Sequence, residues 1–434
     1  MKNILVIGGG LAGLSAATYL TSKNHKVTLF EASPKLGGRT YSKMYSPGNF
    51  IHDNGQHIMM SCYRETFRYL KLIGAESLVE TIPGIFIPFI DKNAESFYLQ
   101  SESNVYPFNL ISAIFGYKKL SFFERIGVVR LFAGLLFGSN SNIADITVGE
   151  WLKKKKQSKN SIEALWEILA VGTLNTSPEK ASAKIFAKVL KEVFLRGTSG
   201  YKMVIPKVGL SQLFCERAVK MIAASGTIKT SLKVQEVIFE SERAINVVTN
   251  KGSFKNFDYI ISAVPFFGIN RIIPDFFENK NFSPEFSPIL SAFIKTDTRK
   301  FAHKYYALIN SPVHWIFVHE KFISIVISNA ADLISEDKNV ISNLIIDELC
   351  VRFSFFMKSD VKDIVLIKEK RATFVPSPGF ECARESFSLP YENFFLAGDW
   401  TNTGLPSTIE SAVKSGFDAA EKVISAINSK PNYH

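Results

Sequence analysis

The first residues of the chain that could do chemistry are glycines, spaced as in a turn that binds phosphate. They follow an apolar stretch, Ile4 to Ile7, and open a segment rich in small residues. This order predicts a strand, a tight turn and a helix whose first backbone N–H groups approach a pyrophosphate. The residues expected to bind a dinucleotide there are Gly8, Gly10, Leu11, Ala12 and Gly13.

A second apolar stretch, Lys26 to Phe30, completes this unit as a predicted strand. It is followed by Glu31 and Ala32, at the distance from the turn where an acid accepts the hydroxyls of a ribose. Such an acid disfavours a 2′-phosphate. Paired glycines beyond it again allow close backbone approach, and an arginine there can form a bidentate contact with phosphate oxygens. These further residues are Gly37, Gly38 and Arg39.

The end of the chain carries a second segment that is expected to bind the cofactor. A short apolar strand, Phe394 to Ala397, is followed by a predicted helix from Thr408, opened by a capping box between Ser407 and Glu410. If a flavin ring lies over this helix N-terminus, the helix dipole stabilises the negative charge that the ring gains on reduction. With the first turn, this indicates FAD. The residues expected at the cofactor are Gly398, Asp399, Leu405, Pro406, Ser407, Thr408 and Ile409.

The elements that must position these residues predict an α/β protein. Between these two sets of cofactor residues lies an aromatic-rich stretch at about 83–202 that we expect to be helical, including 122–137 and 162–194. A strand meander at 227–264 follows it. Strands at 289–295 and 323–328 and a helix at 340–353 follow. We expect a Rossmann-like FAD-binding domain from 1–82, 203–265 and 385–434, and a discontinuous α+β substrate-binding domain from 83–202 and 266–384.

Composition narrows the class of partner. The net charge is +11, with 37 Phe against 4 Trp. Positive charge favours an anionic membrane surface or nucleic acid, and Phe in apolar runs favours a membrane or an apolar cavity over base stacking. We therefore expect no nucleic acid, and peripheral contact with an anionic membrane, with Lys153 to Lys156 as a candidate contact.

The cysteines and the apolar stretches of the sequence indicate where in the cell the protein is expected. The four cysteines form no CxxC pair, which indicates neither zinc nor disulfides and fits a reducing cytoplasm. Lys2 and the apolar stretch after it resemble a signal peptide, but the dinucleotide turn inside that stretch argues against one. No apolar run is long enough to span a bilayer, and 126–138 is either an interfacial helix or a core helix. We expect a cytoplasmic protein, peripheral at the inner face of the cytoplasmic membrane.

These segments resemble the flavin amine oxidase and carotenoid desaturase superfamily, of phytoene desaturase type, over essentially the whole chain. Within it the likeness is to the family of hydroxysqualene dehydroxylases, also described as squalene-associated FAD-dependent desaturases. The narrowest matches are 53–57 (DNGQH), 174–179 (LNTSPE), 371–374 (RATF) and 397–406 (AGDWTNTGLP). Three serines depart from the family pattern, and the first of them is Ser177, where proline is common. Ser407 replaces the usual alanine, and Ser411 replaces the usual glycine, where it either crowds the flavin or adds a hydrogen bond.

The resemblance implies reductive removal of hydroxyl from hydroxysqualene by hydride from reduced FAD, giving squalene in isoprenoid and hopanoid biosynthesis. It implies a hydroxysqualene synthase as a possible partner. Within the FAD site it assigns Gly55 to the ring, Asp399 to the ribityl or pyrophosphate region, and Val234 to a backbone contact with adenine. For Val234 a plain buried strand residue is an equal alternative.

A proton donor is needed for the departing hydroxyl. His57 is the first candidate, because histidine delivers a proton near neutral pH, and Asp53 is the second. A histidine held only by backbone hydrogen bonds is an equal alternative for His57. No zinc motif has the spacing of His52, Asp53 and His57, so no metal is expected.

Three other functions stay open. An oxidative carotenoid or polyene desaturase would use the same scaffold and the same apolar cavity. A non-catalytic prenyl-binding protein would need the cavity without the flavin, which the two nucleotide-binding segments argue against. An amine oxidase would need a cage for a polar nitrogen, whereas the second lobe here is rich in Phe, Ile and Leu.

Overall fold

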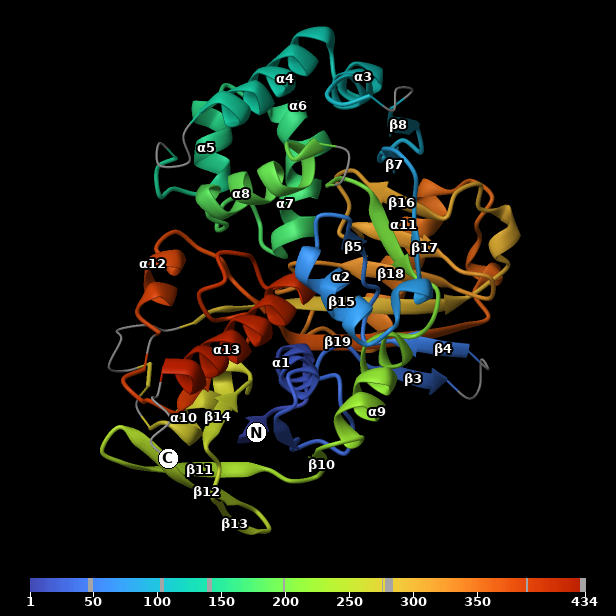
Figure 1. Ribbon diagram of the computed structural model, residues 1–434. Helices are drawn as coiled ribbons and strands as arrows, with labels where there is room; N and C mark the ends of the chain where they lie inside the picture. The colour runs from blue at the N-terminus through green and yellow to red at the C-terminus, as the bar shows by residue number, and fades with distance from the viewer. Residues whose placement is uncertain are drawn as a thin grey trace.

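The computed structural model describes residues 1–45, 50–101, 105–138, 143–197, 200–274, 276–277, 284–387 and 389–429 (Figure 1). Its helices are α1 Leu11–Ser22, α2 Arg64–Leu72, α3 Phe108–Gly116, α4 Phe122–Phe137, α5 Val148–Lys154, α6 Lys159–Ser161, α7 Glu167–Leu174, α8 Ala183–Phe194, α9 Arg217–Ala223, α10 Ile269–Ile272, α11 Lys338–Arg352, α12 Phe380–Glu385 and α13 Ile409–Ser429. Its strands are β1 Asn3–Ile7, β2 Lys26–Phe30, β3 Ser42–Tyr45, β4 Phe50–Asp53, β5 Met59–Met60, β6 Val79–Thr81, β7 Phe86–Ile90, β8 Ser96–Gln100, β9 Met203–Pro206, β10 Thr227–Lys229, β11 Val234–Glu240, β12 Arg243–Thr249, β13 Gly252–Lys255, β14 Tyr259–Ser262, β15 Phe286–Lys295, β16 Tyr305–Leu308, β17 Trp315–Val318, β18 Ile323–Ile327, β19 Asp363–Phe374 and β20 Phe394–Leu396.

A parallel sheet collects the segments that the sequence assigned to the cofactor. Its strand order is β10-β2-β1-β14-β20, and every neighbouring pair is parallel. Both faces are covered, because Ile4 and Val6 pack into one core with α1, α9 and α13, whereas Leu5 and Ile7 pack into another with β11 and β12. The strands end at one edge, so the loops after β1, β2 and β20 meet there.

The first and last helices of the chain pack at close range. A Cβ on Gly416 of α13 would stand 2.1 Å from the carbonyl oxygen of Ala12 in α1, so only glycine fits this crossing. Nearby, Ser15 Oγ donates a hydrogen bond to the carbonyl of Val413 at 3.0 Å. This contact brings the glycine turn at the start of the chain beside the loop that precedes α13.

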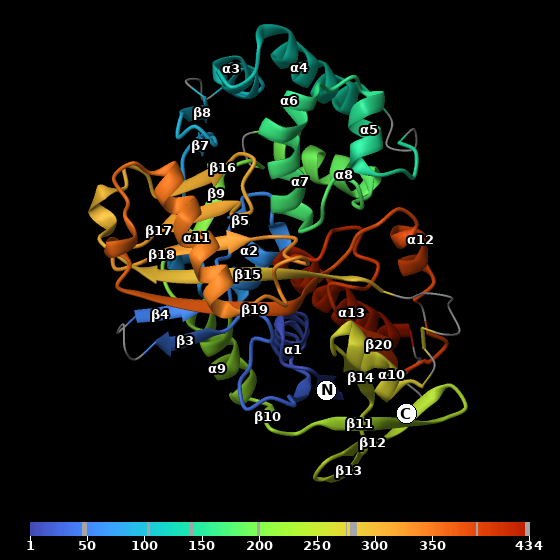
Figure 2. The ribbon, with the colours of Figure 1, turned by 180° about the vertical axis from the view of Figure 1, so that it is seen from behind.

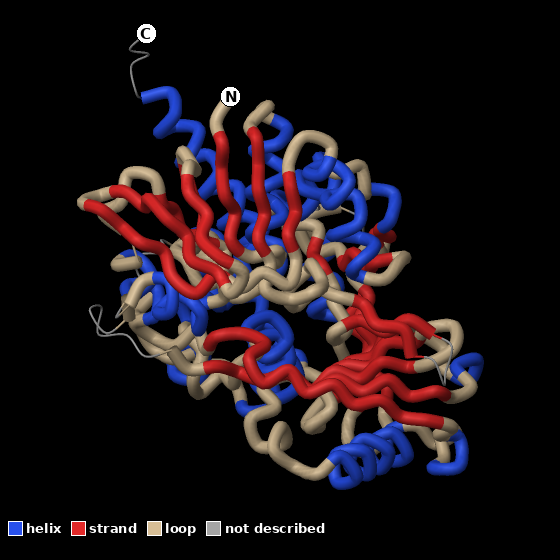
Figure 3. Tube along the Cα trace, turned by 90° about the horizontal axis from the view of Figure 1, so that it is seen from below, coloured by secondary structure: helices blue, strands red, loops and turns tan. Residues whose placement is uncertain are grey.

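A second, mostly antiparallel sheet faces the first across the molecule (Figure 3). Its order is β19-β15-β18-β17-β16-β7-β8. Alternation along the strands gives it two different faces. Leu290 and Ile325 point to one face and pack against α11, whereas Ile289 and Val326 point to the other face and line an internal cavity.

Helices α3 to α8 form a lobe above the two sheets, visible from both sides in Figures 1 and 2. The sequence predicted helix at 122–137, which is confirmed as α4. The prediction that 83–202 is helical is wrong at its start, where β7 and β8 form a hairpin that joins the antiparallel sheet. The apolar run 85–90 fits a strand or a buried helix equally well by pattern, and strand pairing decides.

The predicted helical stretch 162–194 is interrupted. Helix α7 ends at Leu174, and the next residue, Asn175, has a left-handed φ of 50°. The Asn175 side chain donates from Nδ2 to the carbonyl of Ser287 and to Thr373 Oγ1, and its Oδ1 accepts from the backbone N–H of Asn329. One buried amide therefore joins the lobe to the antiparallel sheet. The LNT segment that supported the resemblance thus has a structural role.

The strand meander expected at 227–264 divides between two sheets. Strands β11, β12 and β13 form a small antiparallel sheet of their own, and β14 returns to pair with β1. The residue ranges of the two domains remain a prediction. None of the helices in the described ranges combines the length and apolar character needed to cross a bilayer.

Candidate active site

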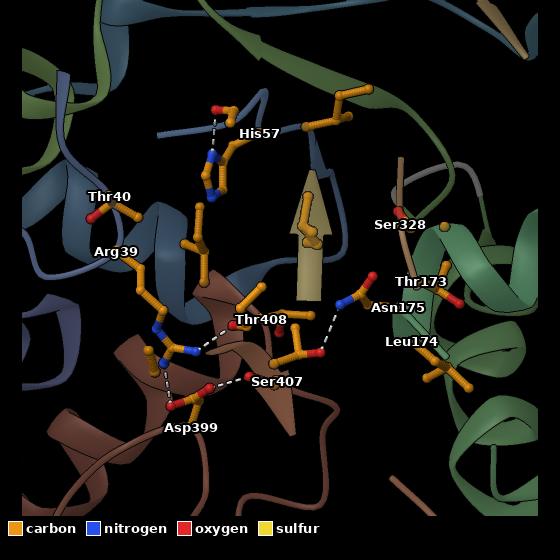
Figure 4. Close-up of a pocket in the computed structure, with 18 of the residues that line it drawn as sticks. Arg39, Thr40, His57, Thr173, Leu174, Asn175, Ser328, Asp399, Ser407 and Thr408 are labelled. Carbon is orange, nitrogen blue, oxygen red and sulfur yellow. Dashed lines mark hydrogen bonds and ion pairs between the residues drawn. The ribbon is translucent and has the colours of Figure 1, made fainter. Parts of the chain in front are cut away.

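A cavity of about 970 Å³ lies between the two sheets and the helical lobe, and its walls come from all three. Figure 4 shows its interior, with Arg39 and Asp399 on one side and Thr173 and Ser328 on the other. The cavity joins the nucleotide edge of the parallel sheet to a region walled by apolar side chains. Of the residues predicted from the sequence, those that line it are Gly8, Gly10, Leu11, Ala12, Glu31, Gly37, Gly38, Arg39, Gly55, His57, Gly398, Asp399, Ser407, Thr408 and Ile409.

The glycine turn leaves space that a side chain would fill. Gly8 has a φ of 105°, and a Cβ there would stand 2.7 Å from the carbonyl oxygen of Ala263. A Cβ on Gly13 would stand only 1.8 Å from the carbonyl oxygen of Gly8, so α1 starts directly against the turn. Gly10 precedes α1 without a capping side chain, so the first-turn N–H groups stay available for phosphate oxygens.

Two more segments complete the cradle. The carboxylate of Glu31 accepts the backbone N–H of Gly9 at 2.6 Å and that of Ser33 at 2.7 Å, which fixes the turn. The backbone N–H of Gly37 donates to the carbonyl of Gly9 at 2.8 Å, so the second glycine pair lies across from the first. The residues present therefore fit a dinucleotide, with backbone on both sides of its phosphates.

A charge pair lies on the wall next to this cradle, with a half-buried arginine and a buried carboxylate. Arg39 Nη2 is 2.6 Å from Asp399 Oδ1, and Arg39 Nη1 donates to the carbonyl of Ala372 at 2.6 Å. Ser407 Oγ donates to the other oxygen of Asp399. Burial alone would raise the pKa of the Asp399 carboxyl, but the charge of Arg39 and the hydrogen bonds from Arg39 and Ser407 outweigh it and hold the pKa below its ordinary value. Asp399 is therefore ionised and fixed.

An arginine that the sequence reasoning missed holds the loop from 398 to 407 in place. The Arg384 side chain is fully buried. Its guanidinium donates to the carbonyls of Thr401, Leu405 and Asp399 and to Thr403 Oγ1. The signal for this residue lies in no motif, because these four partners come together only when the loop folds around the side chain.

The prediction of a capping box between Ser407 and Glu410 is wrong. Ser407 bonds to Asp399 instead, and Thr408 Oγ1 accepts the backbone N–H of Ser411 at 3.2 Å, at the start of α13. The carboxylate of Glu410 accepts the backbone N–H groups of Glu65 and Thr66, so it caps α2 rather than its own helix. A carboxylate near two helix starts binds the one with open N–H groups.

Two of the three serines that depart from the family pattern, Ser407 and Ser411, add hydrogen bonds to this loop. Ser411 is fully buried and its Oγ lies 2.7 Å from Thr403 Oγ1 and 3.2 Å from the carbonyl of Asp399. Of the two alternatives for Ser411, the structure shows the hydrogen bond. Ser407 bonds to Asp399, as described above.

The two candidate proton donors differ in placement. His57 lines the cavity, and its Nδ1 lies 2.9 Å from the carbonyl of Gly55, which makes Nδ1 the protonated nitrogen of the neutral ring. Burial lowers the pKa of His57. Asp53 is not among the lining residues, because its carboxylate accepts the hydroxyl of Ser42 at 2.6 Å and the backbone N–H of Leu210 at 2.9 Å. Burial raises the pKa of Asp53.

Other predicted contacts lie outside the cavity wall. Gly13 and Ala32 adjoin lining residues, and the loop residues Leu405 and Pro406 adjoin Ser407 without lining the cavity. Val234 begins β11, where it pairs with Thr249, and it is half-buried. An adenine contact by Val234 stays a prediction.

The far part of the cavity is an apolar chamber. Side chains from α7 and α8 form one wall, and side chains from β17 and β18 of the antiparallel sheet form another. Polar groups on these walls are few, and include Thr173 and Ser328 (Figure 4). A ligand here is held by shape and by removal of apolar surface from water. The apolar lining includes Ile168, Leu169, Val189, Val193, Phe194, Trp315, Phe317 and Val326.

Comparison with known proteins agrees with this geometry. The model of the family described as flavin containing amine oxidoreductase matches residues 11–424, which is nearly the whole chain. The chain belongs to this family. It is an FAD-dependent oxidoreductase, and the expected cofactor and fold class are confirmed. This assignment to an enzyme family excludes the alternative of a non-catalytic prenyl-binding protein.

The similar proteins include two with one name. The chain is 28% identical to a protein of Zymomonas mobilis subsp. mobilis named hydroxysqualene dehydroxylase, over 97% of this chain and 98% of that protein. It is 27% identical to one of Sinorhizobium fredii with the same name, over 98% of this chain and 99% of that protein. These similarities confirm the resemblance seen in the sequence.

More distant members share the scaffold. A 15-cis-phytoene desaturase from an Oncidium hybrid cultivar is 22% identical over 97% of this chain and 77% of its own length. The crystal structure of a putative protoporphyrinogen oxidase from Exiguobacterium sp. 255-15 superposes with a TM-score of 0.71 at 16% identity, over 99% of both chains. That structure supports the fold alone.

Proposed function

We propose that this enzyme removes the hydroxyl group of hydroxysqualene reductively and releases squalene, in isoprenoid biosynthesis. The observation that carries the proposal is the single cavity that joins a glycine-lined FAD cradle to an apolar chamber. An isoprenoid chain has no charge to pair, so it needs such a chamber and little else. Full-length relatives that carry the name hydroxysqualene dehydroxylase support the same reaction.

The reaction balances with one hydride and one proton. The allylic C–O bond breaks with its electron pair on oxygen, a proton converts the departing hydroxide into water, and hydride adds to the carbon. Reduced FAD, when bound, supplies the hydride and becomes oxidised FAD. The protein must exclude bulk water from a developing carbocation, and the apolar walls from α7, α8 and the antiparallel sheet do so. Aromatic faces on these walls, among them Trp315 and Phe317, favour positive charge.

We propose His57 as the proton donor. It lines the cavity, whereas Asp53 does not. Its Nδ1–H is held by the carbonyl of Gly55, so Nε2 is the nitrogen that can carry the transferable proton. Because burial lowers the pKa of His57, the protonated form is scarce at neutral pH, and activity should rise toward acid pH. The Asp53 carboxylate instead accepts hydrogen bonds from Ser42 and Leu210.

The test is a single turnover with both redox states of the holoenzyme. Purified enzyme with FAD is reduced with dithionite under anaerobic conditions and mixed with hydroxysqualene. We expect squalene by mass spectrometry, with reoxidation of the flavin absorbance in equal amount. Oxidised enzyme is the matched control and should give none. Reduced enzyme that leaves hydroxysqualene unchanged would refute the proposal.

An oxidative desaturase is the second candidate, supported by the 22% identity to a phytoene desaturase. It predicts the opposite flow of electrons, from an isoprenoid to oxidised flavin. Oxidised enzyme incubated with phytoene should then give products with added double bonds and a bleached flavin. The same incubation leaves phytoene unchanged if the enzyme is a dehydroxylase.

Three finer points belong to the same proposal. Squalene made here is expected to serve hopanoid biosynthesis, a hydroxysqualene synthase is expected to supply the substrate, and the enzyme is expected at the inner face of the cytoplasmic membrane. The net charge of +11 supports the last point, because the inner leaflet is anionic.

A further inference from the structure

The solvent-facing side of α4 is apolar. Five residues spaced by three or four positions lie on one stripe of the helix: Phe123, Ile126, Arg130, Gly134 and Phe137. All five are exposed, Phe123 by 82% and Phe137 by 86%. A helix on the surface of a water-soluble domain normally turns polar side chains to this side. Here the one charged residue of the stripe is an arginine, whose long stem lets the guanidinium reach outward past apolar neighbours.

Helix α3 extends this surface. Phe108 and Ile111 are exposed by 64% and 37%. The two helices are linked by ring contacts, because Phe115 lies 6.0 Å from Phe122 and Phe122 lies 5.9 Å from Phe123. Figures 1 and 2 both show α3 and α4 at the outer end of the lobe, farthest from the parallel sheet. We define the outer patch as Phe108, Ile111, Phe122, Phe123, Ile126 and Phe137.

Positive charge collects in the same lobe. Residues 105–202 contain fifteen Lys and Arg against seven Asp and Glu, so they contribute +8 of the net +11. The four lysines from Lys153 to Lys156 are exposed and form no ion pair with described residues. They directly precede Gln157, whose Nε2 donates to the carbonyl of Gly127 in the middle of α4. The lysine run therefore ends next to the middle of α4.

Helix α4 has one acidic residue, Glu124, against two arginines. Glu124 is half-buried and accepts hydrogen bonds from Ser158 Oγ at 2.5 Å and from Asn160 Nδ2 at 3.0 Å. It also belongs to the capping box of α4 with Ser121. Against burial, which alone would raise it, these hydrogen bonds lower the pKa of the Glu124 carboxyl, so it is ionised, but the two arginines of α4 leave the helix with a net charge of +1. Helix α3 contains no acidic residue.

The other side of α4 contacts the chamber wall. Phe132 of α4 packs edge-on against Phe194 of α8, with ring centroids 5.6 Å apart. Phe194 lines the apolar chamber. One layer of helices therefore separates the outer patch from the place where an isoprenoid would bind.

We propose that the outer patch docks this enzyme on an anionic lipid surface, with the phenylalanines among the acyl chains and the lysines at the headgroups. An amphipathic surface of this kind binds through apolar burial and through attraction to anionic lipid together. Docking would bring the chamber next to the bilayer in which an apolar isoprenoid dissolves, and this purpose rests on the proposed function. The docking surface itself is argued from the exposed side chains and the charge, independently of the reaction. Lipid fits better than a protein partner because the exposed rings lie on a lobe with a net charge of +8, whose four lysines at 153–156 form no ion pair with described residues.

The test uses FAD-loaded enzyme and flotation with two kinds of vesicle, phosphatidylcholine alone and an equal mixture with phosphatidylglycerol. Wild-type enzyme should float with the mixed vesicles and only weakly with the neutral ones. The double variant Phe123→Ser, Phe137→Ser should lose roughly tenfold or more of its partition into mixed vesicles. Val340→Ser with Val351→Ser is the matched control, since both lie exposed on α11, and it should float as wild type does.

A charge variant gives an independent arm. Replacement of Lys153 to Lys156 by glutamine should abolish the preference for anionic over neutral vesicles while the protein keeps its FAD absorbance. Raised salt should have the same effect on the wild type. Unchanged flotation of both variants, or a wild type that does not bind mixed vesicles, would overturn the proposal. A phenylalanine variant that floats as wild type does but sediments as a smaller species would identify the patch as a protein interface instead.

Failure of the proposed function gives a different result. The phenylalanine variant should convert detergent-dispersed hydroxysqualene at the wild-type rate and vesicle-embedded hydroxysqualene more slowly. If the wild type floats with anionic vesicles but yields no squalene in either form, the surface stands and the reaction is wrong.

Discussion

The two ends of the cavity are built in different ways. At the nucleotide end, the wall consists mainly of backbone atoms. They are packed so closely that a Cβ on Gly13 would stand 1.8 Å from the carbonyl oxygen of Gly8. At the apolar end, the wall consists of side chains from helices and strands that are far apart in the chain, such as Leu169 and Val326. One end binds by fixed hydrogen-bonding groups, and the other binds by shape.

This difference predicts how each end responds to substitution. Backbone that lies directly against a ligand leaves no space for a side chain, so a single added methyl group can abolish binding. An apolar wall can rearrange, so one substitution should change substrate affinity by a modest factor and leave the cofactor in place. The variants below test that contrast in order of expected effect.

The largest effect is expected from Gly13→Val. Its Cβ has no room beside Gly8, so the turn and the start of α1 must separate. We expect purified variant protein without flavin absorbance and without activity. Gly134→Ala is the control, because no atom lies within 4 Å of a Cβ there, and it should be yellow and fully active. A yellow Gly13→Val protein would mean that the turn is not the phosphate site.

His57→Gln tests the junction of the two ends. If His57 donates the proton, kcat should fall by roughly 10²–10⁴. In the wild type, kcat should decline as pH rises through the lowered pKa of His57, and this decline should vanish in the variant. The check is a pH profile of single-turnover rates, with FAD binding measured alongside.

The same shift has an opposite consequence for stability. The folded protein binds the His57 proton less tightly than the unfolded chain does, because burial lowers the pKa. The free energy of unfolding contributed by this group is therefore present above the ordinary pKa of histidine and is lost as pH falls toward the lowered value.

If the His57→Gln variant keeps the wild-type pH profile of single-turnover rates, His57 is a structural residue held by the carbonyl of Gly55 and not the proton donor.

Arg384→Lys should come next in size. Lysine keeps the charge but cannot donate to the carbonyls of Thr401, Leu405 and Asp399 and to Thr403 at once. Buried carbonyls left without partners cost about 2–3 kcal/mol, so FAD affinity should fall roughly a hundredfold. Arg243→Lys, in an exposed ion pair with Glu392 outside the cavity wall, should cost much less. Equal losses in the two variants would contradict the role of Arg384. Titration of apoenzyme with FAD measures both.

The contrast also explains what could be predicted from the sequence. The glycine turn, Glu31 and the 398–409 loop are short segments in which each residue type has a local reason, and the structure places most of them at one cavity. Arg384 could not be found, because its partners come from a loop that only the fold brings around it. The capping role of Glu410 was assigned to the wrong helix, because the start of α2 is 344 residues away in the chain.

The apolar end shows the limit more clearly. Composition predicted an apolar cavity but named none of its walls, since any Leu or Phe in the second lobe satisfies the pattern equally. The hairpin β7–β8 was interpreted as part of a helical lobe, because an apolar run such as 85–90 carries no period. Shape complementarity emerges only from the packed structure.

The smallest effect is expected from Leu169→Asn in the chamber wall. An amide placed among apolar side chains should raise KM for hydroxysqualene about tenfold, while the flavin spectrum and FAD affinity stay as in the wild type. Leu344→Asn on α11 is the matched control, because Leu344 is also half-buried but packs away from the cavity, so it should lower the melting temperature without changing KM. Loss of FAD from Leu169→Asn would break the division between the two ends, because a wall that binds only by shape has no hydrogen bond to the cofactor. A change confined to KM would sharpen it.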